Sequence, residues 1–151
     1  MDILDSSRTK PYKGDWLGIY SPAKAGKAIP VTIRLTDVND DGTLEGSFAL
    51  DPNWAKGQGI QMATFRSGTY SPFGTLHIVQ DVVEKNYNDE VEFNGQFLVP
   101  AGHTGVIYGS VIVRRIQTGS APKIVQTGTL SATYGAAQIM TVAEGMWTNG
   151  G

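Results

Sequence analysis

Apolar and polar residues alternate along most of this chain, in short runs separated by tight-turn residues. A period of two places successive side chains on opposite faces of a β-strand, so each run predicts a strand with one buried face. The clearest run places Val31, Ile33 and Leu35 on one face and Thr32 and Arg34 on the other. No stretch has the periodicity of a convincing amphipathic helix. The predicted strands span about 14–20, 29–38, 43–50, 60–70, 75–83, 90–99, 105–116 and 123–134, with a ninth at about 138–146.

Short connections join these strands in sequence. Asp41-Gly42 supplies the positive φ angles of a tight hairpin, and Ser71-Pro72-Phe73-Gly74 is a tight turn. Sequential strands usually pair, and closing the sheet removes its exposed edges. The pattern therefore predicts an all-β fold, a single antiparallel up-and-down β-barrel of about eight strands, with a β-sandwich as the alternative. Residues 1–12 are interpreted as a flexible N-terminal arm and 13–151 as the barrel domain.

Composition narrows the possible functions. The 151 residues fit one domain, and the absence of cysteine excludes disulfides and thiolate-bound metals. A net charge of -2 argues against a nucleic-acid surface, and no apolar run approaches the roughly 20 residues of a membrane helix. We therefore expect neither nucleic acid nor membrane as a partner. A natural start at Met1 would mean a cytoplasmic protein, but a trimmed chain with an added methionine would look the same.

Alternate connections of a meander lie at opposite ends of the barrel. Those at about 39–42, 71–74, 100–104 and 135–137 are mostly tight turns, so we expect that end to be plugged. Those at about 21–28, 51–59, 84–88 and 118–122 are longer, and long loops on a rigid scaffold favour binding. The candidate ligand-binding residues on them are Trp54, Tyr87, Lys24, Lys56 and Lys85, with Lys27 and Lys123 nearby.

These residues predict a small-molecule-binding barrel, since small eight-stranded barrels can hold one ligand. A ligand with an apolar body and a negative group would suit aromatic rings beside lysines, although loop lysines also serve solubility alone. Trp54 has no strand to bury it, so it either folds over the barrel mouth or plugs it. One alternative is a lectin-like carbohydrate- or protein-binding sandwich that uses Trp54 and Tyr87 as stacking platforms. The other is a barrel cyclase or isomerase, for which the sequence offers no positive evidence; we assign no catalytic residue and no cofactor.

Gly14-Asp15-Trp16 resembles the start of the calycin group, the lipocalins and avidins, and Asp41-Gly42-Thr43-Leu44 resembles the second avidin-type hairpin. The resemblance covers residues 14–50. It implies that Trp16 closes the barrel floor or lines the cavity, with Arg114 or Arg115 packed on its ring. The chain has no room for the lipocalin helix, so an avidin-like meander fits better. Leu17-Gly18-Ile19 replaces the polar biotin ligands of avidins, so biotin binding is not implied.

Two other polar constellations carry possible chemistry. Residues 37–42 match the first half of a calcium loop, but Phe48 stands where the bidentate glutamate belongs, so a hairpin turn is the favoured interpretation and a weak calcium site the alternative. His77 and Asp81 share one strand face, with Glu92 available from the next strand. This trio could form a general acid/base set, although a polar surface is favoured. We predict no metal site.

The strands at 75–83 and 105–116 are apolar on both faces, which is typical of strands buried on both sides. The outer face of a barrel strand is covered only by another chain. We therefore expect a homo-oligomer, with Val79, Val83, Tyr108 and Ile112 facing outward as one patch.

Overall fold

The fold is seen in a computed structural model of the 151-residue chain. The structure describes residues 10–24, 26–50, 63–83, 87–99 and 104–134, and these ranges contain nine β-strands and no helix. Accordingly, no helix in the described ranges could span a membrane. The strands are β1 (Gly14–Pro22), β2 (Ile29–Val38), β3 (Leu44–Leu50), β4 (Ala63–Thr64), β5 (Ser67–Tyr70), β6 (Thr75–Val83), β7 (Asn88–Leu98), β8 (Val106–Ile116) and β9 (Lys123–Tyr134).

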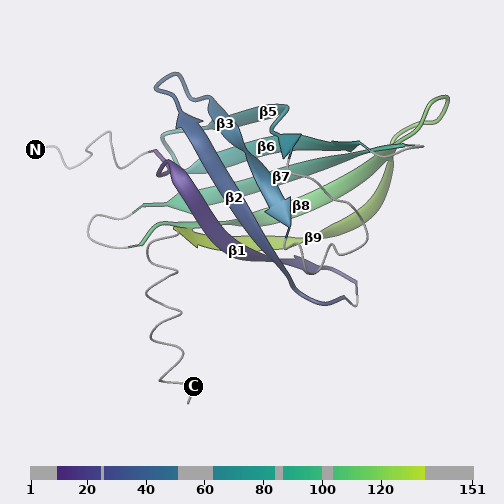
Figure 1. Ribbon diagram of the computed structural model, residues 1–151, viewed down its shortest axis with the longest axis horizontal. Helices are drawn as coiled ribbons and strands as arrows, with labels where there is room; N and C mark the ends of the chain where they lie inside the picture. Colours follow the sequence, from purple (N-terminus) through teal and green to yellow (C-terminus); the bar gives the residue numbers. More distant parts are fainter. Residues whose placement is uncertain (1–9, 25, 51–62, 84–86, 100–103, 135–151) are drawn as a thin grey trace, which may run out of the picture.

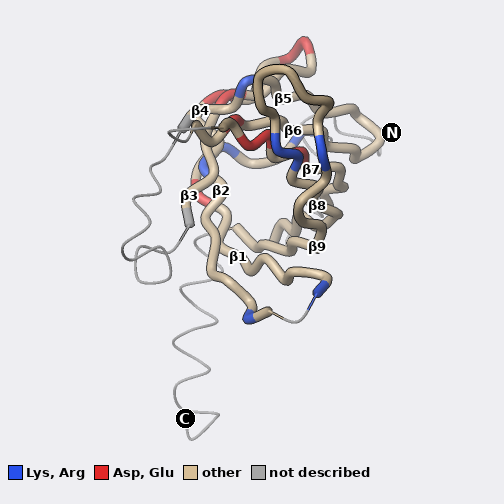
Figure 2. Tube along the Cα trace, turned by 90° about the vertical axis from the view of Figure 1, so that its right-hand side faces the viewer, with Lys and Arg blue, Asp and Glu red and all other residues tan. Residues whose placement is uncertain are grey.

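All nine strands belong to one antiparallel sheet in the order β4-β3-β2-β1-β9-β8-β7-β6-β5. The sheet curls until its two edges meet, and Figure 2 looks along the resulting ring. At the seam, the Phe65 N–H donates to the Gly46 carbonyl (2.7 Å) and the Arg66 N–H donates to the Val79 carbonyl (2.7 Å). Strands β4 and β5 therefore act as one bent strand that pairs first with β3 and then with β6 (Figure 1). The fold is a nearly closed, up-and-down barrel of eight strands, as predicted, and the β-sandwich alternative is wrong because there is one continuous sheet.

The period-two pattern located the strands to within a few residues. One difference is the predicted strand at 60–70, which is interrupted at Phe65 and Arg66 where the chain changes partners. Its first residues and the predicted ninth strand at 138–146 lie outside the described residues.

The barrel interior is one continuous apolar core. Trp16, Ile33 and Phe93 are fully buried. A Cβ on Gly109 would lie 2.4 Å from the Cα of Gly95, so β7 and β8 approach there more closely than any larger residue allows. The other buried core residues are Tyr20, Ile29, Val31, Leu35, Leu44, Leu76, Ile78, Phe97, Val99, Ile107, Val111, Leu130 and Ala132.

Candidate functional site

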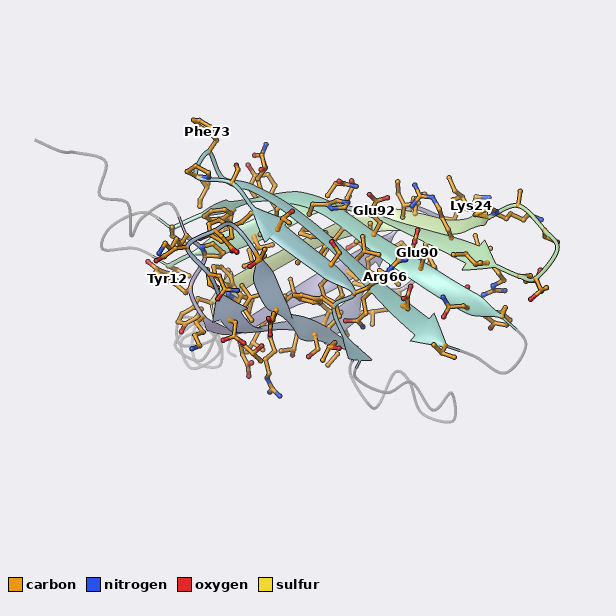
Figure 3. The ribbon with its side chains drawn as sticks, turned by 90° about the horizontal axis from the view of Figure 1, so that it is seen from above. Tyr12, Lys24, Arg66, Phe73, Glu90 and Glu92 are labelled. Atoms are coloured by element: carbon orange, nitrogen blue, oxygen red, sulfur yellow. The ribbon has the colours of Figure 1, made fainter. Side chains whose placement is uncertain are left out.

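The two ends of the barrel differ in how they are filled. At one end, here called the Trp16 end, the Tyr70 N–H donates to the Gly42 carbonyl (2.9 Å) and the Phe97 N–H donates to the Gly74 carbonyl (2.8 Å). These bonds tie the β2–β3 and β5–β6 hairpins to neighbouring strands. The opposite end, here called the Lys24 end, carries the β1–β2, β6–β7 and β8–β9 connections. Figure 3 shows Tyr12 and Lys24 at these opposite ends.

Three aromatic side chains close the Trp16 end. The Trp16 ring stacks on Tyr12 at a centroid distance of 6.1 Å and meets Tyr134 edge-on at 5.4 Å. Its indole N–H donates to the Tyr12 carbonyl (2.9 Å), so the buried polar atom is satisfied. The predicted burial of Trp16 is confirmed. The arginine expected on its ring is not there: Arg114 and Arg115 lie at the far end of β8, and Tyr134 takes that place.

The inward-facing side of β6–β9 changes from apolar to charged toward the Lys24 end. Antiparallel register places the side chains in rows across the four strands. The first row is buried. The second row has one buried, two half-buried and one exposed residue, and the third ends in two cationic side chains. The rows are Ile78, Phe93, Val111 and Gly128; then Gln80, Val91, Val113 and Gln126; then Val82, Asp89, Arg115 and Lys123.

Arg115 is held in place at this end by partners that include Asp89 and Tyr87. Its Nε and Nη2 donate to the two carboxylate oxygens of Asp89 at 2.9 and 3.0 Å. Its guanidinium carbon lies 3.8 Å from the centre of the Tyr87 ring, a cation–π contact. The bidentate geometry fixes the direction of the guanidinium plane. Lys123 is the direct cross-strand neighbour of Arg115, so the row carries two cations and one carboxylate.

The Tyr20 hydroxyl lies inside the barrel. Tyr20 is 7% exposed, and its hydroxyl oxygen has no hydrogen-bond partner among the residues that the structure describes. Its ring packs against Gly128, whose added Cβ would lie 2.5 Å from Cε1 of Tyr20. Burial raises the pKa of the phenol. A buried, unpaired hydroxyl is unfavourable by about 1–3 kcal/mol, so this atom is suited to meet a ligand group.

The structure covers only part of the predicted site. Lys24 is exposed and lies beside β9, because the neighbouring Ala23 N–H donates to the Thr127 carbonyl (2.8 Å). Tyr87 lies at the same end, with one ring face covered by Arg115. Lys27 is exposed on the same β1–β2 connection. Trp54, Lys56 and Lys85 lie outside the described residues.

Sequence reasoning missed the polar groups inside this end. Tyr20 follows Trp16 by four residues, and Arg115 follows Val111 by four, so strict alternation already places both on the inner face. The signal was therefore present: a polar residue at an inward position near the end of an otherwise apolar strand.

The predicted His77, Asp81 and Glu92 set separates into two pairs on the outer face. His77 Nε2 lies 2.7 Å from Glu92 Oε2, while the Asp81 carboxylate pairs with Arg66 at 3.4 Å. Arg114 Nη1 donates to Glu92 at 2.7 Å. The bonds from Arg114 and His77 lower the pKa of Glu92 to about 2. An ionised carboxylate held this firmly serves to position its neighbours and is a poor general base.

The same ion pairs extend across β5–β8. Glu90 bonds to Arg66 and lies 3.5 Å from Arg114, which joins the two pairs into one network. Arg66, Glu90 and Glu92 lie close together in Figure 3, and Figure 2 shows charged positions gathered around β5, β6 and β7.

The segment that resembles half of a calcium loop forms a hairpin turn. Asp41 accepts hydrogen bonds from the Thr43 N–H (3.0 Å) and hydroxyl (2.6 Å), and these bonds lower the pKa of Asp41. Within the described ranges, no three histidine or acidic side chains gather closely enough to hold a metal ion.

The predicted outer apolar patch is not continuous. Val79 is buried within the chain, and Glu92 lies between Val79 and Ile112 in the sheet. Tyr108 lies on the same outer face, and its hydroxyl donates a hydrogen bond to Gln96. Burial of Val79 by its own chain explains its apolar character without a partner subunit. The homo-oligomer stays a prediction.

Comparison with models of protein families finds no match for this chain, and comparison with curated protein sequences finds none either.

Proposed function

We propose that this protein binds a small, partly apolar ligand with an anionic group at the Lys24 end of the barrel. The observation that carries the proposal is the change from apolar to cationic side chains along the inner face of β6–β9. A barrel of this kind is compatible with ligand binding. The apolar first row and the two valines of the second row suit a hydrocarbon body. Arg115 and Lys123 suit a carboxylate or phosphate at the rim.

The buried Tyr20 hydroxyl supports the same location. It lies beside Gly128, in the row that is deepest of the three, and no described residue there forms a hydrogen bond with it. A ligand oxygen that accepts its hydrogen would remove an unfavourable buried donor. The Lys24 end therefore combines apolar inner-face side chains with a hydroxyl that has no partner in the described part of the chain.

The expected affinity comes mainly from the apolar part. Apolar burial contributes about 25 cal/mol per Å² of surface, whereas an exposed ion pair contributes about 0–1 kcal/mol. The anionic group would contribute more to ligand specificity than to binding affinity. We also propose a calycin-like relationship, supported by the buried Trp16 at the floor and weakened by the tyrosine in the place of the expected arginine.

The test uses isothermal titration with dodecanoate and, as an uncharged match, dodecanol. We expect dodecanoate to bind more tightly, and its advantage to shrink at high salt because screening weakens exposed ion pairs. Lys123→Gln should weaken dodecanoate binding about two- to fivefold. Lys13→Gln is the matched control, because this exposed lysine adjoins β1 at the Trp16 end. Absence of binding by either probe, or equal loss in the two lysine variants, would contradict the proposal.

Tyr20→Phe provides an independent measurement. Because the hydroxyl is buried and unpaired, its removal should leave the unfolding free energy of the free protein unchanged or raise it by about 1 kcal/mol. The same variant should bind dodecanoate more weakly. A loss of more than about 1 kcal/mol of stability would mean that the hydroxyl has a partner in the free protein.

A further inference from the structure

An open hollow lies on the outside of the barrel. This hollow of about 510 Å³ opens on the outer face of β5–β8, within the range of about 300–1,000 Å³ typical of small-molecule sites. Its floor is the backbone of Leu76, Gly95 and Gly109, which are direct neighbours across β6, β7 and β8. Outward-facing side chains border this floor in two rows, Thr69, His77 and Asn94 on one side and Thr75, Gln96 and Tyr108 on the other.

The side chains of the two bordering rows are polar, and the lining carries no lysine, arginine, aspartate or glutamate. It offers hydroxyl, amide, imidazole and phenol groups, which donate and accept hydrogen bonds without a fixed charge. Tyr108 is 40% exposed, so part of its ring faces solvent. Its hydroxyl donates to Oε1 of Gln96 at 2.6 Å, which orients the Gln96 amide. The amide N–H groups of Gln96 are hydrogen-bond donors for a ligand.

Glu92 positions two side chains of the row that contains Thr69, His77 and Asn94. Its carboxylate lies 2.7 Å from Nε2 of His77 and also accepts a hydrogen bond from the Asn94 side chain. Arg114 holds Glu92 in turn, at 2.7 Å. Two lining side chains are therefore fixed by a group that does not itself line the hollow, an arrangement that prepares a site before its ligand arrives.

We propose that this hollow binds an uncharged carbohydrate. Sugar hydroxyls both donate and accept hydrogen bonds, which matches the amides and hydroxyls of the two rows. The apolar C–H face of a sugar ring can pack on the exposed Tyr108 ring, which combines an apolar body with a polar tip. The lining has no lysine or arginine to attract an anionic ligand or a nucleic acid. The proposal does not depend on ligand binding at the Lys24 end.

The test is saturation-transfer NMR with maltose, cellobiose, lactose and chitobiose, followed by titration of any sugar that responds. We expect at least one disaccharide to receive saturation from the wild-type protein. Tyr108→Ala and Asn94→Ala should each weaken its binding about tenfold or more. Thr127→Ala, an exposed change on the outer face of β9, and Lys123→Gln, at the Lys24 end, should leave it unchanged.

Glu92 is tested as a positioning residue. Glu92→Gln should weaken sugar binding and shift the His77 imidazole NMR signals. Glu45→Gln, an exposed change on β3, should change neither. The proposal would be overturned if none of the four sugars received saturation from folded wild-type protein. Binding that survives both Tyr108→Ala and Asn94→Ala would also overturn it, because the sugar would then lie elsewhere.

Discussion

Replacement of Trp16 by alanine is the sharpest test of how the barrel is closed. Trp16 is fully buried, stacks on Tyr12, meets Tyr134 edge-on, and donates its indole N–H to the Tyr12 carbonyl. Gly105 leaves space for the ring, since an added Cβ there would lie 2.6 Å from the indole. The substitution therefore leaves a cavity between Tyr12, Gly105 and Tyr134.

The magnitude follows from burial. Truncating a buried tryptophan to alanine is destabilising by about 3–5 kcal/mol. Domains of this size are stable by about 5–15 kcal/mol, so the variant loses a large part of the total. At roughly 2–4 °C per kcal/mol, the melting temperature should fall by roughly 6–20 °C. Trp16→Phe keeps most of the apolar contact but loses the bond to the Tyr12 carbonyl, so its effect should be smaller.

Urea unfolding followed by circular dichroism measures both variants. Phe73→Ala is the control, because Phe73 is 93% exposed at the tip of the β5–β6 hairpin and its removal should change stability by less than about 0.5 kcal/mol. If the unfolding free energies of Trp16→Ala and Phe73→Ala differ by less than about 1 kcal/mol, the aromatic cluster does not close the barrel. The calycin-like relationship would then lose its most distinctive residue.

Three further predictions concern the sheet and its outer face. Gly109→Ala should be strongly destabilising in urea unfolding, since its Cβ would lie 2.3 Å from the Asn94 carbonyl oxygen; the exposed neighbour Ser110→Ala should be close to neutral. Glu92 has its pKa lowered from 4.5 to about 2, so it stabilises the fold above pH 4.5 and loses this effect as the pH falls toward 2. The stability gap between wild type and Glu92→Gln, at most about 3 kcal/mol near neutral pH, should shrink over that window, and a constant gap would contradict the assigned cause. For the homo-oligomer, sedimentation should show an assembly that Ile112→Asp, in the predicted outer patch, dissociates into folded monomers; a monomeric wild type would refute it.

The sequence alone located most of the β-structure. Alternation along 29–38 and 123–134, with Asp41-Gly42 at a hairpin, specifies strands and turns through contacts within a few residues. Alternation also assigned inner and outer faces. The burial of Trp16 was predicted from the Gly14-Asp15-Trp16 resemblance, and the structure confirms it. Strand positions, turns and buried faces depend on residues close together in the sequence. They can therefore be predicted before it is known which strands pair.

Tertiary structure decided which side chains meet across strands. Val79 looked like an interface residue but is buried by its own chain, and Asp81 pairs with Arg66, which precedes the short β5, instead of joining His77. Arg115 faces Asp89 only because β7 and β8 pair in one register. A shift of one residue in that register would move every side chain to the opposite face. Register is set by the closure of the whole barrel, and no local pattern contains that information.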